Sequence, residues 1–560
     1  MKVSAKSTDR ETSSEVARCH NNSDTKNVGW LACLAIVLFC AATSLSLAAE
    51  GARPNVLIIV ADDLGYSDLG CYGGEIETPQ LDRLAANGLK FSQCYSTGRC
   101  WSSRAAILTG YYAQQVRRDA LPKVPSAGGR GIRPGWAQLL PAILKPQGYR
   151  SYHSGKWHID GSPLKNGFEH AYVIEDHDRY FYPRNHTEDD KPLPPVERDS
   201  GFYLTTAIAD HAIKSLREHA QQYSDKPFFQ YLCFTSPHFP LHALPEDIAK
   251  YEKRYLAGWD VLRAERFARQ RELGIITCDL AQRAEKTAPR WNPSEAELQQ
   301  KVGPGEIGRA VAWTDLTEKQ RLFQAEKMAI HAAMVDRMDR EIGRVVEQLT
   351  AMKALDKTLI MFVSDNGASA EQIIRGDGHD PTAPLGSGRS YLGLGPGWST
   401  TSNSPFRMHK SWVHEGGIST PLIVHWPQGI AEKGALRQTP AHLIDLVPTV
   451  LEVTQTKRPE TWNEKPVPTP PGTSLVPAFV QDVTVPHDYL WWFHDGNRAV
   501  RVGDWKIVSW GMEGPWELFD VRADRSETRN LAMQFPNKLS ELQKLWETKL
   551  EEFQVLTKED

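Results

Sequence analysis

The chain has 560 residues, of which 41% are apolar and 24% are charged, the ordinary composition of a globular protein. Its formal net charge is −4. This balance argues against nucleic acid as a partner, because proteins that bind phosphate backbones carry a basic surface.

An apolar run from Leu31 to Ala42 follows a polar N-terminal stretch with Lys26 near its end. Small and hydroxyl residues then lead to Leu-Ala-Ala at residues 47–49, a sequence that suits signal peptidase. The apolar run is short for a helix that crosses a bilayer. We therefore interpret residues 1–49 as a signal peptide rather than a retained anchor. The mature protein is expected to be exported, to a periplasm or as a secreted protein, without stable membrane insertion.

Two apolar runs end in pairs of polar residues. The run Asn55–Val60 has the continuous, β-branched pattern of a strand buried on both faces, and Asp62 and Asp63 follow it. Far downstream, a second run of this kind precedes Asp365 and Asn366. Both pairs are expected at the carboxyl end of a buried strand.

Two further strands carry polar residues at or near their ends. One spans the segment YRSYHSGKWHID with Lys156 and His158, which would point to the same face of an extended chain. The other leads into His238. An amphipathic helix is predicted from about Pro79 to Asn87. Strands separated by such helices predict a mostly parallel sheet, and such sheets bind ligands at the carboxyl ends of their strands.

The remaining segments complete the predicted architecture. A long amphipathic helix is expected within residues 315–349, and residues 367–405 are rich in Gly, Ser and Pro, as in a functional loop. After a Pro-rich connector, short strands with turns at Asp495-Gly496 and Gly503-Asp504 precede a closing helix.

We predict an α/β fold with a large, mostly parallel mixed β-sheet sandwiched by helices. A smaller C-terminal antiparallel sheet is packed by a helix. The predicted catalytic α/β domain spans residues 50–480, and a C-terminal α+β subdomain spans residues 481–560.

The two polar pairs form a candidate metal site. Carboxylates brought together repel each other unless a cation offsets them, and oxygen ligands suit Ca²⁺ or Mg²⁺ better than zinc. Taken singly, Asp-Asp and Asp-Asn-Gly are also ordinary turn signals. The occurrence of both pairs after buried strands favours a metal site made by Asp62, Asp63, Asp365 and Asn366.

Several cationic and imidazole side chains are candidates for binding an anion. Lys156 and His158 together would suit a tetrahedral oxyanion, and Lys410 lies in the segment HKSWVHEGG. His238, which lies between two prolines, is a candidate general acid. For each residue alone, a solvated lysine or a structural histidine is the competing interpretation.

The segment CWSSRAAILTG, from Cys100 to Gly110, resembles the sulfatase signature C-x-P-S-R-x-x-x-L-T-G. Around it, NVLIIVADDLGYSDLGCYGG, GKWH, SPHFPLHA, SDNG and HEGGISTPLIVHWP resemble the other blocks of type I sulfatases, in the same order. These enzymes are the arylsulfatase family of the alkaline phosphatase superfamily. The resemblance covers residues 53–556. The chain departs from the signature at Ser102, where the family usually has Pro.

The resemblance implies that Cys100 is oxidised to Cα-formylglycine, whose hydrate is the nucleophile. A sulfated serine would be a stable ester, whereas a sulfated aldehyde hydrate can expel sulfate as its carbonyl re-forms. The resemblance also implies partners: a formylglycine-generating or sulfatase-maturing enzyme, and a sulfated small molecule or glycan as substrate.

Further roles follow from the same resemblance. The implied ligands of Ca²⁺, or alternatively Mg²⁺, are Asp62, Asp63, Asp365, Asn366 and the modified Cys100. Among the implied catalytic residues, Arg104 orients the formylglycine, and Lys156 and Lys410 neutralise sulfate oxygens. His158 takes a proton during elimination. His238, together with Lys410, protonates the leaving alcohol. Asp365 is implied to take the proton of the attacking hydroxyl.

The expected function is hydrolysis of aryl sulfate or sulfated carbohydrate monoesters by an exported sulfatase. Two alternatives stay open. One is a phosphonate or phosphate monoester hydrolase of the same superfamily. The other is an inactive homologue that binds sulfated glycans with Cys100 unmodified.

Overall fold

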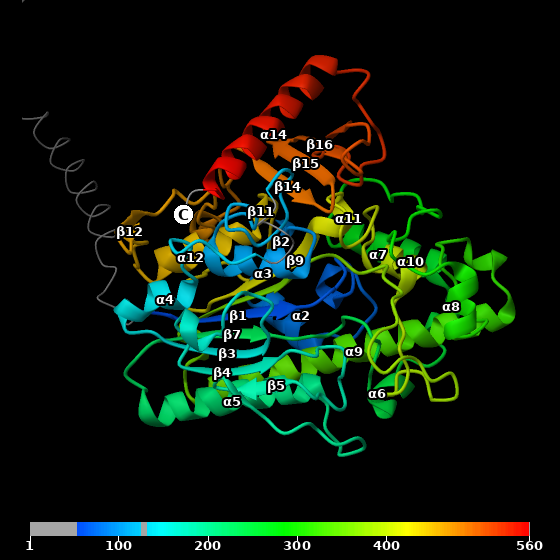
Figure 1. Cartoon of the computed structure of the whole chain (residues 1–560), viewed down its shortest axis with the longest axis horizontal. Coiled ribbons are helices and arrows are strands. Elements are labelled where there is room, and N and C mark those ends of the chain that lie inside the picture. Colours follow the sequence, from blue (N-terminus) through cyan, green and yellow to red (C-terminus); the bar gives the residue numbers. More distant parts are fainter. Residues whose placement is uncertain (1–52, 125–130, 559–560) are drawn as a thin grey trace, which may run out of the picture. The chain divides into compact units, whose positions relative to one another are not determined.

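The computed structural model describes residues 53–124 and 131–558, so the predicted signal peptide lies outside the described residues. A large mixed sheet forms the centre of the described chain (Figure 1). Its strand order is β10-β2-β9-β8-β1-β7-β3-β4-β5-β6, with β11 paired to β2. None of the described helices is both long and apolar enough to cross a bilayer.

The middle of the sheet is parallel. Strand β1 (Asn55–Ala61) lies between β8 (Thr358–Ser364) and β7 (Phe228–Cys233), and β7 is followed by β3 (Arg150–Lys156) and β4 (His170–Ile174). All four pairings are parallel, whereas β9 pairs antiparallel with β8 and with β2. The predicted mostly parallel mixed sheet is therefore confirmed.

The sheet ends in short strands on both sides, β10 and β11 next to β2, and β5 and β6 next to β4. The bounds of the strands outside the parallel middle are β2 Leu89–Tyr95, β5 His186–Glu188, β6 Lys191–Pro192, β9 Ser419–His425, β10 Ala435–Arg437 and β11 Ala441–His442. A separate two-stranded ribbon consists of β12 Thr461–Trp462 and β13 Lys465–Pro466.

Strand β1 shows why the apolar runs of the sequence are continuous. Val56, Ile58 and Val60 belong to one apolar core and the alternate residues, including Leu57 and Ile59, belong to another. Because successive side chains of a strand point to opposite faces, a strand covered on both faces has to be apolar throughout.

Helices cover both faces of the sheet. One face packs against α2 (Pro79–Ala86), α5 (Leu204–Gln222) and α9 (Glu318–Ala351), and the other against α3 (Cys100–Thr109), α4 (Leu140–Leu144) and α12 (Leu446–Val453) (Figure 1). The two predicted amphipathic helices correspond to α2 and α9. The remaining helices are α6 Pro245–Ala249, α7 Trp259–Glu272, α8 Glu295–Lys301, α10 Gly395–Ser402, α11 Glu415–Ile418 and α13 Val476–Val480.

The C-terminal sheet is antiparallel, in the order β14 (Leu490–His494), β15 (Asn497–Val502), β16 (Trp505–Ser509) and β17 (Glu517–Asp520). One face packs on α14 (Pro536–Leu556), where the rings of Trp491 and Trp546 stack 5.5 Å apart. Residues of the opposite face, such as Trp492, share an apolar cluster with Val413 and Ile418. The predicted small sheet with a closing helix is confirmed; the domain boundary at residue 480 stays a prediction.

Three local expectations differ from the structure. Strand β3 ends at Lys156, and His158 has a left-handed φ of 59°, so these two side chains do not share one extended face as predicted. Strand β7 ends at Cys233, and His238 lies in the turn after it. The Gly/Ser/Pro-rich region 367–405 contains α10 as well as loops. In the first two cases a local turn ends the strand early, and in the third a short helix interrupts the loop region.

Candidate active site

The sheet brings the two predicted polar pairs together. Strands β1 and β8 are parallel neighbours with Ala61 opposite Ser364, so Asp62 and Asp365 leave the sheet side by side. Asp63, which has a left-handed φ of 65°, donates its backbone N–H to Asp365 Oδ1 at 3.4 Å. The convergence predicted from the carboxyl ends of parallel strands is therefore present.

Three cations offset the buried carboxylates. Lys156 Nζ lies 2.5 Å from Asp62 Oδ2, and Lys410 Nζ lies 2.7 Å from Asp63 Oδ1. Arg104 holds Asp365 Oδ2 with Nε at 2.9 Å and Nη2 at 2.8 Å. All of these side chains are buried. Since buried like charges repel strongly, the three ion pairs are what allows the acidic groups to be packed together.

The carboxyl groups have strongly displaced pKa values. Burial alone would raise the pKa of Asp62, but the ammonium of Lys156, with His238 and Arg104, lowers it well below the ordinary 3.8. For Asp365, burial and the neighbouring Asp62 carboxylate raise the pKa to about 7. A buried cluster with opposed shifts of this kind is typical of functional sites.

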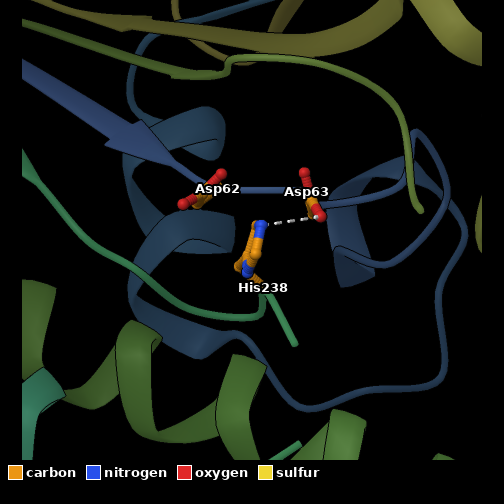
Figure 2. Close-up of side chains that lie close together, drawn as sticks. All are labelled: Asp62, Asp63 and His238. Carbon is orange, nitrogen blue, oxygen red and sulfur yellow. Dashed lines mark ion pairs between the residues drawn. The ribbon is translucent and has the colours of Figure 1, made fainter. Parts of the chain in front are cut away.

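Unsatisfied oxygens in this cluster fit a hard cation. Asp62 Oδ1 and Asn366 Oδ1 are buried and accept no hydrogen bond within the described chain. Ligand atoms of Asp62, Asp63 and His238 lie within 4.8 Å of one another, and Figure 2 shows these three side chains close together, with the ion pair between His238 and Asp63 dashed. Buried oxygens without a donor are costly, so a cation bound here would satisfy them.

The surroundings of His238 favour one tautomer of its ring, the one that carries its proton on Nδ1. Its Nδ1 lies 2.5 Å from the backbone oxygen of Phe239, and its Nε2 lies 3.7 Å from Asp63 Oδ2 (Figure 2). Burial lowers its pKa to about 4, so the ring is neutral at neutral pH. With Nδ1–H donating to Phe239, the Nε2 lone pair faces a carboxylate, an arrangement that favours a proton donor or a cation between them.

Cys100 begins α3, directly after Arg99 in the extended conformation, and its side chain is buried. All five cysteines of the described residues are free thiols, and Cys100 is among them. Arg104, one helical turn later on α3, reaches from Asp365 to the backbone oxygen of Lys156 through Nη1 at 2.8 Å. Its guanidinium therefore ties the helix that carries Cys100 to the ends of β8 and β3.

Ser102, the departure from the family signature, makes local hydrogen bonds. Its Oγ lies 2.7 Å from Thr97 Oγ1 and donates to the backbone oxygen of Arg99 at 3.0 Å. Ser103 Oγ lies 2.8 Å from the same threonine hydroxyl. The hydroxyl groups of Ser102 and Ser103 on α3 thus hold the turn before Cys100. At position 102, a proline ring would instead restrict φ and could not make these hydrogen bonds.

His158 lies beside the acidic cluster and is linked to it by contacts between aromatic rings. Its ring centre is 5.9 Å from Trp101, the residue after Cys100, and 5.8 Å from His177. His177 in turn lies edge-on to His238 with ring centres 5.2 Å apart. All the sequence-predicted site residues therefore lie in or beside one cluster, and their individual roles stay predictions.

Two residues of this cluster were missed in the sequence. Glu371 binds Lys410 Nζ through Oε2 at 3.2 Å, and its Oε1 accepts from Arg99 at 3.2 Å and from Trp291 Nε1 at 2.9 Å. His177 lies in a polar loop. A lone acidic or histidine residue in a loop carries no pattern, so only the fold could have placed them.

The family model named "Sulfatase" matches residues 54–456 of this chain. The chain belongs to the sulfatase family. A second family model, "N-sulphoglucosamine sulphohydrolase, C-terminal", matches residues 406–555 of the sulfatase. The sulfatase is 30% identical to an arylsulfatase of Klebsiella aerogenes over 459 residues, which covers 76% of this chain and 92% of the relative.

Other relatives include carbohydrate sulfatases. The sulfatase is 26% identical to N-acetylgalactosamine-6-sulfatase of Rattus norvegicus over 524 residues, covering 88% of this chain and 78% of the relative. Its fold matches that of a protein solved in complex with its substrate D-glucosamine-2-N,6-O-disulfate, with a TM-score of 0.59 and 22% identity over 90% of this chain and 98% of that chain. The sulfatase is a sulfuric ester hydrolase with an α/β fold.

Proposed function

We propose that this sulfatase hydrolyses sulfate monoesters of carbohydrates or phenols through a formylglycine formed from Cys100, with Ca²⁺ held by the acidic cluster. The observation that carries the proposal is the convergence of three buried cations, Lys156, Lys410 and Arg104, on the carboxylates next to the helix that begins at Cys100. Sulfated ligands fit such a centre, because preorganised cations stabilise charge on sulfate oxygens.

The metal proposal rests on the two unsatisfied oxygens and the candidate ligand group. Asp62, Asp63, Asp365 and Asn366 would hold the ion, with His238 in reach of the same position. When bound, a calcium ion would act as a Lewis acid toward a sulfate oxygen. It would also relieve the repulsion that raises the pKa of Asp365.

The proposed reaction has two steps on the modified residue 100. In the first, one hydroxyl of the formylglycine hydrate loses its proton to Asp365 and its oxygen attacks sulfur, and the sulfur–oxygen bond to the alcohol breaks. The leaving alcohol takes a proton from His238 or Lys410. In the second, the remaining hydroxyl loses its proton to His158, the carbon–oxygen bond to sulfate breaks, and the carbonyl re-forms. Water then restores the hydrate.

The proposal also covers the substrate class, the export of the chain and the maturation of Cys100. The relatives named for aryl and N-acetylgalactosamine-6-sulfate esters support either a phenolic or a sugar alcohol as leaving group. We further propose that the chain is exported behind residues 1–49 and that a formylglycine-generating or sulfatase-maturing enzyme converts Cys100. The hydroxyl contacts of Ser102 support a turn that presents Cys100 without proline.

Matched esters test the proposed function. The enzyme, co-expressed with a maturation enzyme, should release 4-nitrophenol from 4-nitrophenyl sulfate far faster than from 4-nitrophenyl phosphate. Faster turnover of the phosphate would favour a phosphate or phosphonate monoester hydrolase instead. Binding of sulfated glycans without turnover of any ester would favour an inactive binding protein.

A further inference from the structure

We propose that Arg375 forms an anion subsite at the rim of the active site, which binds a second sulfate or a carboxylate of a polyanionic glycan. The inference rests on the proposed function, since it assigns a specificity-determining residue to that reaction. Its ligand is an oxoacid anion next to the sulfate ester that is cleaved.

Arg375 lies one aromatic ring away from two candidate catalytic residues. Its guanidinium carbon is 5.5 Å from the ring centre of Phe239. The same ring stacks on His238 with centres 4.4 Å apart, and Lys410 Nζ lies 5.9 Å from its centre. Because both distances run to one ring centre, the cations of Arg375 and Lys410 are no farther apart than these two distances together.

The charge of Arg375 is available to a ligand. Its side chain is exposed, and among the described residues it has neither an ion-pair partner nor a hydrogen-bond partner. The neighbouring arginines are different. Arg179 pairs with Asp176 at 3.0 Å and with Asp377 at 3.5 Å, and Asp377 also accepts from Arg184 and Arg198, each at 3.3 Å.

The segment that carries Arg375 is held against the site. Gly376 adopts a left-handed φ of 59°, and a Cβ there would lie 3.3 Å from Arg179 Nη2. The Tyr391 hydroxyl donates to Asp178 Oδ2 at 3.4 Å, and its ring centre lies 6.4 Å from Phe239. The backbone N–H of Leu241 donates to Leu392 at 2.9 Å, which joins the Phe239 turn to the same segment.

The chemistry of the guanidinium defines the ligand. Arginine presents paired N–H donors that match two oxygens of a sulfate or carboxylate, and it is more weakly hydrated than lysine. An arginine stacked on a buried aromatic ring has a restricted orientation, so less freedom is lost when the ligand binds. A neutral sugar hydroxyl at this position would leave the cation without its best partner.

The test compares matched substrates in three variants. The substrates are glucosamine 6-O-sulfate, glucosamine 2-N,6-O-disulfate and a 6-O-sulfated disaccharide that carries a uronic acid. The variants are Arg375→Ala, Arg375→Lys and Arg389→Ala. Arg389 is a matched control because it is exposed, lies on the same segment and already pairs with Asp380 at 3.6 Å.

Arg375→Ala should raise the KM for a doubly anionic substrate about tenfold more than the KM for glucosamine 6-O-sulfate. Arg375→Lys should fall between it and the wild type, Arg389→Ala should match the wild type, and salt should shrink the effect. A response to the disulfate alone identifies sulfate as the ligand, and a response to the uronide alone identifies carboxylate.

An equal change of KM for all three substrates, or no change, would overturn the inference while leaving the proposed function intact. A wild-type enzyme that releases sulfate from none of the three substrates nor from 4-nitrophenyl sulfate would contradict the proposed function itself. The two failures are therefore distinguished before any variant is compared.

Discussion

At the residue scale, His238 is the group whose proposed role is most open to test. Its Nε2 faces Asp63 and its ring is neutral at neutral pH because burial lowers its pKa to about 4. A neutral ring with its proton on Nδ1 can donate a proton from Nε2 only after it is protonated there or changes to the other tautomer. Substrate binding would have to supply that change, or Lys410 would be the donor.

His238→Ala should therefore slow esters of alcohols far more than esters of nitrophenols. A general acid contributes about 100- to 10,000-fold where the leaving oxygen is basic, and little where it is not. The measurement is log kcat against the leaving-group pKa for a series of aryl and alkyl sulfates. Parallel lines for the variant and the wild type would assign the proton to another group, with Lys410 the first candidate.

At the element scale, the C-terminal sheet holds the segment that carries Lys410. Asn497 on β15 donates to the backbone oxygen of Ser411 at 2.8 Å. Glu415, the first residue of α11, is bound by Lys506 of β16 at 2.8 Å and by Arg525 at 3.1 Å. These buried contacts place the small sheet behind the active site as a support for Lys410.

Glu415→Gln should lower the free energy of unfolding by about 3 to 5 kcal/mol at pH 7, because it removes the carboxylate that pairs with the buried Arg525 and one of the two that pair with Lys506. Burial would raise the pKa of Glu415, but Lys506 and Arg525 lower it to about 2. A depressed pKa stabilises the fold above the ordinary value of 4.5, and this stabilisation is lost as the pH falls toward 2.

Urea unfolding of both proteins between pH 7 and pH 3 measures this difference, which should shrink at the acidic end. Glu541→Gln is the control, since its pair with Lys538 on α14 is exposed and contributes at most about 1 kcal/mol. A difference for Glu415→Gln that is as small as that of the control would show that the network does not hold the sheet.

The elements themselves were largely predictable from the sequence. Apolar runs such as Leu359–Val363 and amphipathic stretches such as α9 carry periodic signals, and parallel pairing then brings Asp62 beside Asp365. Local turns carry no such signal. The left-handed turn at His158, which the sequence had named as a site residue, and the positions of the loop residues His177 and Glu371 became visible only in the three-dimensional structure.

At the scale of the whole molecule, metal binding should be visible in stability as well as in activity. An ion that binds only the folded state stabilises it by about 2.7 kcal/mol at a concentration 100-fold above its Kd. The melting temperature should therefore rise when Ca²⁺ is added to chelator-treated protein. Scanning calorimetry across a calcium titration measures the rise.

Asp62→Asn should remove this calcium dependence, because it weakens a ligand whose Oδ1 has no other partner. Asp377→Asn is the control, since that carboxylate lies in the arginine cluster and outside the acidic site. A wild-type melting temperature that does not respond to Ca²⁺ or Mg²⁺ would contradict the proposed metal site.

The chemical state of residue 100 is the most direct test of the proposed formylglycine mechanism. Trypsin cleaves after Arg99 and Arg104, so the peptide Cys-Trp-Ser-Ser-Arg reports that state by mass spectrometry. We predict that preparations made with and without a maturation enzyme differ in the fraction of aldehyde, and that sulfatase activity rises in proportion to this fraction. A fully active preparation in which Cys100 is entirely the unmodified thiol would contradict the account.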